Sequence, residues 1–229
     1  ETKYIAGEKT KEVLYRENGC VFRFNIDNTY FSPRLSNERK EIAGSVKKND
    51  LVLVMFAGVG PFSIVIGKNS PAKKIYSNEI NREANKYCKL NIELNKLKDK
   101  VEIVPGDVKR VVGKLKKMSD FGQGVKKKSS FRASRKEREE NKGLPRFDVI
   151  VMPRPQLKET FLKEAFKLSK KGTKIIYYDF CDADKIDEVK DKIKNEAKKC
   201  KKKIRILKTK TAGEIAPYRV RVRVDFMII

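Results

Sequence analysis

The sequence contains no histidine and no tryptophan, and its four cysteines form no C-x-x-C pair. These absences argue against a His-based catalytic triad and against a zinc site, so we expect no metal. No run of about 18 apolar residues occurs, so we expect no membrane span, and no secretory signal is visible. We therefore expect a cytoplasmic protein whose cysteines behave as small apolar side chains.

Acidic residues are scarce relative to basic ones. Among 229 residues, 55 are Lys or Arg and 30 are Asp or Glu, which gives a net charge of +25. A field of that sign favours a polyanionic partner, and nucleic acid is the first expectation. A proteome that is rich in lysine throughout would give the same excess. We expect a monomer.

The apolar pattern changes after the first thirty residues. Residues 1–31 predict a small β-rich unit, with Asn18-Gly19 as the turn of a hairpin. Ser36 or Asn37 is expected to cap a helix that extends to about residue 46. Strands and helices then alternate, with strands expected at 51–56, 74–78, 101–104, 147–152 and 174–178, and helices at 61–68, 81–97, 158–170 (stopped by Gly172) and 185–201. This alternation predicts an α/β fold with a doubly wound, mostly parallel sheet in residues 32–229.

The chain ends in two segments, 203–209 and 219–229, that are expected to pair as an antiparallel hairpin. In the last strand Val220, Val222, Val224 and Phe226 are expected on one face, and Arg219, Arg221, Arg223 and Asp225 on the other. A terminal antiparallel hairpin is the usual ending of the seven-stranded class I methyltransferase sheet.

Residues 113–146 are rich in Lys, Arg, Ser and Gly and show almost no periodicity. We interpret them as a basic insertion between the third and fourth parallel strands. The insertion is either a solvated loop without a role or an arm that contacts phosphates.

Candidate cofactor residues follow the first three parallel strands. Gly58 and Gly60 permit a tight turn and a close approach of the backbone to a ligand. A third glycine, which a pyrophosphate-binding turn would need, is replaced by Ser63. Glu79 can accept hydrogen bonds from ribose hydroxyls and Asp107 from an adenine amino group; each is alternatively a helix cap or turn residue. Together they favour S-adenosylmethionine over a dinucleotide.

Five segments in one order carry a more specific resemblance: YFSPRLSNER (30–39), VLVMFAGVGPFSI (52–64), NEINREANKYCKLNIELNKL (78–97), GDV (106–108) and AGEIAPYRVRVRVDF (212–226). The chain resembles the archaeal and eukaryotic tRNA guanosine-37 N1-methyltransferases and their relative, the aminocarboxypropyl transferase of the wybutosine pathway. The resemblance implies the class I fold, S-adenosylmethionine as cofactor and the tRNA anticodon loop as substrate. It also implies that the cofactor pocket is lined by Arg39, Phe56, Glu79, Ile80, Asp107 and Val108.

Three features depart from the family pattern. Val54 stands where members commonly have Asp, and Pro153-Arg154-Pro155 replaces the family's Asn-Leu-Pro or Asn-Pro-Pro. The small N-terminal domain that grips the corner of the tRNA in the family is not part of this sequence. Pro153, Arg154, Pro155 and Gln156 are still expected to form a wall of the target-base pocket.

Two residues are candidates for the chemistry. In the family, the glutamate that matches Glu38 is proposed as the general base that removes the N1 proton of guanine. Arg34 is expected to hydrogen-bond guanine O6 and to stabilise the charge that develops there. Alternatively, Glu38 only favours the helix dipole and Arg34 only binds phosphate. The rival functions are aminocarboxypropyl transfer and non-catalytic RNA binding on a degenerate scaffold.

Overall fold

The computed structural model describes residues 5–112, 146–153 and 159–229. The elements are β1 (Glu12–Glu17), β2 (Cys20–Asn25), η1 (Pro33–Leu35), α1 (Ser36–Ser45), β3 (Leu51–Val54), α2 (Pro61–Asn69), β4 (Lys74–Glu79), α3 (Arg82–Leu94), β5 (Val101–Pro105), β6 (Phe147–Met152), α6 (Leu162–Lys167), β7 (Ser169–Asp182), α7 (Ile186–Lys199), β8 (Ile204–Ala216) and β9 (Arg219–Ile228). None of the helices in this part of the chain is long and apolar enough to cross a membrane.

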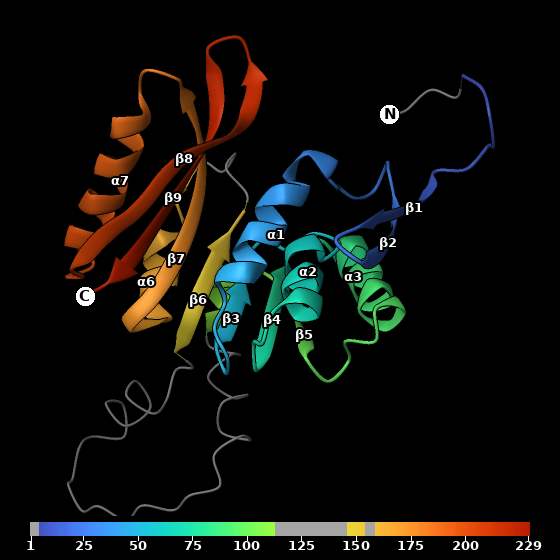
Figure 1. The fold of residues 1–229 in the computed structure, drawn as a ribbon, viewed down its shortest axis with the longest axis horizontal. Helices are drawn as coiled ribbons and strands as arrows, with labels where there is room; N and C mark the ends of the chain where they lie inside the picture. Colours follow the sequence, from blue (N-terminus) through green and yellow to red (C-terminus); the bar gives the residue numbers. More distant parts are fainter. Residues whose placement is uncertain (1–4, 113–145, 154–158) are drawn as a thin grey trace, which may run out of the picture.

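Seven strands form one sheet in the order β5-β4-β3-β6-β7-β9-β8 (Figure 1). The first five of these strands are parallel, and β9 pairs antiparallel with both β7 and β8. The predicted doubly wound sheet with a terminal antiparallel hairpin is therefore confirmed. Because the strands are parallel, the ends of β3, β4, β5 and β6 meet at one edge, where ligands bind in folds of this kind.

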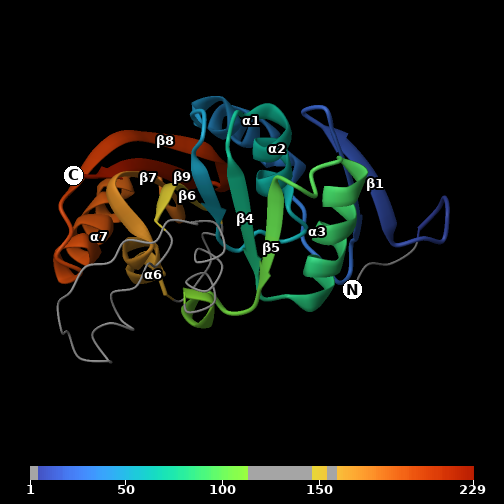
Figure 2. The same ribbon diagram turned by 90° about the horizontal axis from the view of Figure 1, so that it is seen from below.

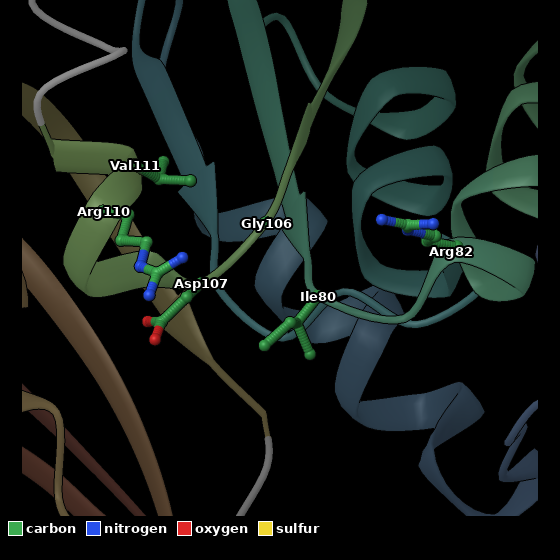
Figure 3. A pocket seen from close by; sticks show the side chains of 6 residues that line it. All are labelled: Ile80, Arg82, Gly106, Asp107, Arg110 and Val111. Carbon is green, nitrogen blue, oxygen red and sulfur yellow. The ribbon is translucent and has the colours of Figure 1, made fainter.

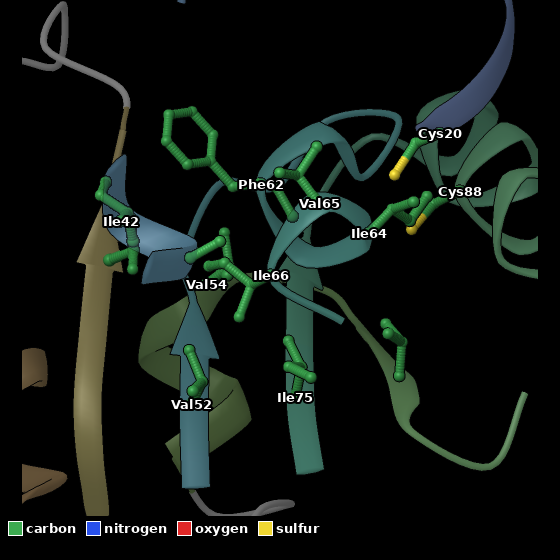
Figure 4. Packing of buried hydrophobic residues seen from close by; sticks show 14 of the residues in the cluster. Cys20, Ile42, Val52, Val54, Phe62, Ile64, Val65, Ile66, Ile75 and Cys88 are labelled. Atoms are coloured by element: carbon green, nitrogen blue, oxygen red, sulfur yellow. The ribbon is translucent and has the colours of Figure 1, made fainter. Parts of the chain in front are cut away.

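Apolar side chains cover both faces of the sheet, as continuous apolar strands require. Figure 2 shows α1 and α2 on one side and α6 and α7 on the other. On the first side Ile42, Val54 and Phe62 belong to one buried cluster (Figure 4). On the second side Phe166 and Phe226 belong to another. Val54, which departs from the family pattern, is fully buried in the first cluster.

The β1–β2 hairpin forms a separate two-stranded sheet with its turn at Asn18-Gly19, as predicted. Its side chains Cys20, Phe22 and Phe24 belong to the same buried cluster as α1 and α2. The hairpin therefore packs as a layer over the helices of the main sheet, and the boundary at residue 31 stays a prediction.

Three details differ from the sequence-based expectations. Neither Ser36 nor Asn37 caps α1, because η1 runs directly into the helix and Leu35 occupies the capping position. The helix expected to stop at Gly172 ends at Lys167. Gly172 instead lies in the early part of β7, where the Thr173 hydroxyl accepts a hydrogen bond from Lys170 N at 2.8 Å and donates one to Phe147 O at 2.6 Å.

Candidate functional site

Three alternate residues of the turn after β3 adopt left-handed backbone conformations. Phe56, Gly58 and Gly60 have φ angles of 57°, 58° and 89°. A Cβ at Gly60 would lie 2.7 Å from Cys88 Sγ, so glycine is required there for space as well as for conformation. Phe56 is not glycine, and a left-handed aromatic residue is an uncommon strained feature that concentrates at functional sites.

Glu79 fixes this turn from the end of β4. Its Oε2 accepts a hydrogen bond from Gly58 N at 2.8 Å, and its Oε1 accepts one from Asn81 N at 2.7 Å. The residue is only 7% exposed. Each carboxylate oxygen retains a second lone pair. Glu79 therefore shapes the glycine turn and still has acceptor capacity for two donors of a ligand.

A pocket of about 650 Å³ opens after the ends of β4 and β5 (Figure 3). Its lining consists of Ile80, Arg82, Gly106, Asp107, Arg110 and Val111. Ile80 is 59% exposed at the rim of this pocket. An apolar side chain next to a carboxylate suits a ligand with a flat apolar face and a polar edge.

Asp107 begins the helical residues 108–112 and accepts a hydrogen bond from Lys109 N at 2.8 Å through Oδ1. The Asn78 amide donates to Val104 O at 2.8 Å and to Gly106 O at 2.9 Å, which fixes the turn before Asp107. Val108, predicted to line the pocket, has its side chain in the buried cluster under α6 and α7. Sequence reasoning missed Asn78, Arg82, Arg110 and Val111, for which the sequence carries no distinguishing pattern.

Arg39 makes its described contacts away from this pocket. It is 1% exposed, and its guanidinium forms two hydrogen bonds to the Glu17 carboxylate and one to Ser32 O. It also lies over the rings of Phe31 and Phe62, at 5.1 and 5.6 Å from their centres. The structure therefore brings Arg39 to the β1–β2 hairpin, and its predicted cofactor contact stays a prediction.

Glu38 lies in a second group of polar residues, between α1 and strands β7, β8 and β9. Its Oε2 accepts hydrogen bonds from Tyr178 Oη at 2.7 Å and Arg223 Nη1 at 3.1 Å, and Lys210 Nζ lies 2.5 Å from its Oε1. Burial alone would raise the pKa of Glu38, but the hydrogen bonds from Lys210, Tyr178 and Arg223 outweigh it and lower the pKa below its ordinary value. Glu38 is therefore an ionised, buried carboxylate.

The strand register places this group at the ligand-binding edge. Tyr177 pairs with Met152, the last residue of β6, so Tyr178 lies level with Pro153. Arg34, four residues before Glu38, is exposed. Pro153 is partly buried after the end of β6, whereas Arg154, Pro155 and Gln156 lie outside the described residues. The structure thus brings Glu38 and Pro153 to the same end of the sheet.

A parallel sheet with this strand order, a glycine turn after its first strand and acids after the next two define a class I methyltransferase. A family model described as "TRM5/TYW2 methyltransferase domain" matches residues 13–121. The tRNA (guanine(37)-N(1))/4-demethylwyosine(37)-methyltransferase Taw22 of Nanoarchaeum equitans is 34% identical over 99% of this chain and 82% of its own length. The chain belongs to the TRM5/TYW2 methyltransferase family.

Other relatives agree with this assignment. The tRNA (guanine(37)-N(1))-methyltransferase Trm5b of Pyrococcus abyssi is 30% identical over the whole chain, which spans 59% of that relative. A solved complex of aTrm5 with tRNALeu superposes with a TM-score of 0.72 at 31% identity, over 98% of this chain and 55% of that one. The TYW2 of M. jannaschii in complex with AdoMet superposes with a TM-score of 0.75 at 25% identity, over 99% of this chain and 90% of that one.

Proposed function

We propose that the chain is an S-adenosylmethionine-dependent tRNA methyltransferase that methylates N1 of guanosine 37 in the anticodon loop. The observation that carries the proposal is the buried, ionised Glu38 carboxylate at the sheet edge that also carries Glu79 and the pocket lined by Ile80 and Asp107. Family membership and the activities for which the relatives are named support it.

The residues at the edge fit S-adenosylmethionine. Glu79 retains lone pairs for the two ribose hydroxyls, and Asp107 Oδ2 accepts no hydrogen bond among the described contacts. Ile80 offers its exposed apolar side chain to the adenine face. When bound, S-adenosylmethionine supplies a methyl group on a sulfonium, which needs no further activation.

Glu38 is the proposed acceptor of the guanine N1 proton. A carboxylate with a lowered pKa is ionised at neutral pH, and it is therefore in the form that accepts a proton, although it is a weak base. Proton transfer to such a base becomes easier when a cation stabilises the negative charge on guanine O6. The exposed Arg34, one helical turn before Glu38, is the proposed donor to that oxygen.

We also propose that Pro153, Arg154, Pro155 and Gln156 form a wall of the target-base pocket and that basic residues bind the tRNA backbone. The net charge of +25 supports RNA binding, as does the relative's complex with tRNALeu. The protein is proposed to act as a monomer in the cytoplasm.

A second candidate activity is methylation of 4-demethylwyosine at position 37. The Nanoarchaeum equitans relative, which matches 99% of this chain, is named for both activities, and this favours the second candidate specifically. Aminocarboxypropyl transfer is the third option, because a TYW2 structure superposes over 99% of the chain.

Mass spectrometry of tRNA nucleosides separates these reactions. Two tRNA samples, one with unmodified guanosine 37 and one with 4-demethylwyosine 37, are incubated with the protein and cofactor labelled only in the methyl group. Labelled N1-methylguanosine at position 37 is the expected result. Label found only in the 4-demethylwyosine sample supports the second candidate. Label left in the released thionucleoside supports aminocarboxypropyl transfer, and no product together with no cofactor binding overturns the enzyme proposal.

A further inference from the structure

Arg221 is a buried cation without a described counter-charge. It is 8% exposed, and its Nε is buried and has no hydrogen-bond partner. The interaction described for its guanidinium is with the ring of Phe180, whose centre lies 5.3 Å away. A buried guanidinium N–H without an acceptor is unfavourable, and a contact with an aromatic face compensates only in part.

The buried and partly buried cations beside Arg221 on this face are paired, whereas Arg219, at the exposed start of β9, forms no described ion pair. Arg223, two residues along β9, forms two hydrogen bonds to Asp225 at 2.7 Å and one to Glu38. Lys174 lies 3.3 Å from Asp225, and Lys210 contacts Glu38. Among the buried cations described on this face, Arg221 therefore differs from Arg223 in having no acidic partner.

The strand register places Arg221 farther toward the end of β7 than the group around Glu38. Arg221 pairs with Phe180 and Arg223 with Tyr178, so Arg221 lies two residues farther toward the end of β7. Two residues of a strand span roughly 7 Å. Because Tyr178 and Arg223 both contact Glu38, Arg221 stands about one strand repeat outside the proposed general base, on the side from which a substrate must approach.

Two anions of the proposed reaction are candidates for Arg221: the carboxylate of the cofactor and a phosphate of the RNA. The sheet order places β6 and β7 between β3 and β9. Three strand spacings amount to about 14 Å, so the glycine turn after β3 and the pocket beyond it are distant from Arg221. A guanidinium also matches a phosphate geometrically, with two parallel hydrogen bonds.

We propose that Arg221, held against Phe180, binds a backbone phosphate of the RNA next to the target nucleotide. The inference rests on the proposed function, because it requires an RNA substrate at this edge. Phe180 holds the guanidinium plane, and the phosphate supplies the counter-charge that the described residues do not provide. Arg221 is then a substrate-binding residue rather than a structural one.

The test compares R221M with R205M. Arg205 is an exposed residue near the opposite end of the β8–β9 hairpin, so both variants lose one positive charge. We expect R221M to keep or raise the melting temperature, because an unpaired buried charge is removed. We expect its affinity for tRNA to fall about tenfold and the slope of log affinity against log salt to decrease by about 1. R205M should keep both the affinity and the slope.

Each other outcome is decisive. If R221M is as stable as expected but binds tRNA like R205M, the inference is overturned. If R221M loses affinity for S-adenosylmethionine in calorimetry while tRNA binding is unchanged, Arg221 binds the cofactor carboxylate and the inference is again wrong. If R221M does not fold, R221K decides, since lysine keeps the charge but not the planar fork: weaker tRNA binding supports the site, and wild-type binding overturns it. If the wild-type protein does not methylate tRNA, the proposed function is refuted instead.

Discussion

The side-chain amide of Asn91 in α3 forms two hydrogen bonds with the backbone of Arg23 in β2, 68 residues away in sequence: Arg23 N donates to Asn91 Oδ1 at 2.7 Å, and Asn91 Nδ2 donates to Arg23 O at 3.0 Å. One helical turn later, Asn95 makes the same pair of bonds with Val21, at 2.9 and 2.7 Å. Two amide side chains thus take the place of a neighbouring strand along the free edge of β2, and they attach the N-terminal hairpin to the methyltransferase sheet.

Replacement of Asn91 by alanine tests this attachment. Asn91 is fully buried, so the variant leaves the N–H and C=O of Arg23 without their partners. Unsatisfied buried groups cost about 1–3 kcal/mol each, and we expect the free energy of unfolding to fall by roughly 2–4 kcal/mol in urea titrations. Lys89→Ala, on the exposed side of the same helix, should change it by less than about 0.5 kcal/mol. Equal stabilities of the two variants would contradict the role of Asn91.

The sheet and the glycine turn were predictable because they depend on local patterns. Continuous apolar runs predict buried parallel strands, and the sequence pattern predicts a helix that begins at Asn81. In the structure the Asn81 side chain caps this helix by accepting hydrogen bonds from Glu83 N and Ala84 N. The early end of α6 was not predictable, because the turn around Gly172 is fixed by the bonds of Thr173 to Lys170 and Phe147.

The partners of the charged residues could not be predicted either. The sequence contains 55 basic residues, so each acid has many possible partners. Glu38 contacts Arg223, which lies 185 positions later in the sequence. The family pattern places Glu38 and Arg39 side by side, but on the helix they point to different neighbours. Glu38 reaches β7, β8 and β9, whereas Arg39 reaches Glu17 of the N-terminal hairpin. Only the packing of α1 shows that adjacent residues serve different parts of the molecule.

Gly60→Ala should abolish cofactor binding and destabilise the fold. The new Cβ would lie 2.7 Å from Cys88 Sγ and 3.1 Å from Ile64 Cδ1, in a conformation with a φ angle of 89° that alanine rarely adopts. We expect a lower melting temperature and no heat of binding in calorimetric titration with S-adenosylmethionine. The matched control is Gly44→Ala, because a Cβ at Gly44 meets nothing within 4 Å and lies in α1.

The control should increase stability by about 0.5–1 kcal/mol, as alanine does in a helix. Normal cofactor affinity in Gly60→Ala would show that the turn after β3 relaxes without loss of the site.

Glu38→Gln should slow methyl transfer by about 10²–10⁴-fold, the usual contribution of a general base. Glutamine keeps the size of the side chain but cannot accept the guanine proton. Single-turnover measurements with saturating tRNA and cofactor isolate this step. Glu41→Gln is the matched control. Glu41 contacts the same Lys210 and Arg223, but its side chain is more exposed than that of Glu38. If the two variants lose activity equally, the loss comes from the ion-pair network and not from a missing base.

The same network predicts how stability depends on pH. Hydrogen bonds from Lys210 lower the pKa of Glu41 to about 2, from its ordinary value of 4.5 in the unfolded chain. A carboxylate whose pKa is lower in the folded state adds stability that is fully present above pH 4.5. That stability is lost as the pH falls toward about 2, because protonation then occurs in both states. Glu41→Gln should therefore melt below the wild type at neutral pH and approach it near pH 2.

Melting curves of Glu41→Gln and Glu214→Gln between pH 7 and the acid limit of folding check this prediction. Glu214 is exposed and forms no ion pair among the described contacts, so its replacement should shift the melting temperature little at any pH. A difference between Glu41→Gln and wild type that stays constant down to pH 2 would mean that Glu41 stabilises the fold by packing. A difference that shrinks with acid shows that the carboxylate charge holds Lys208 and Lys210 against α1, beside the proposed base.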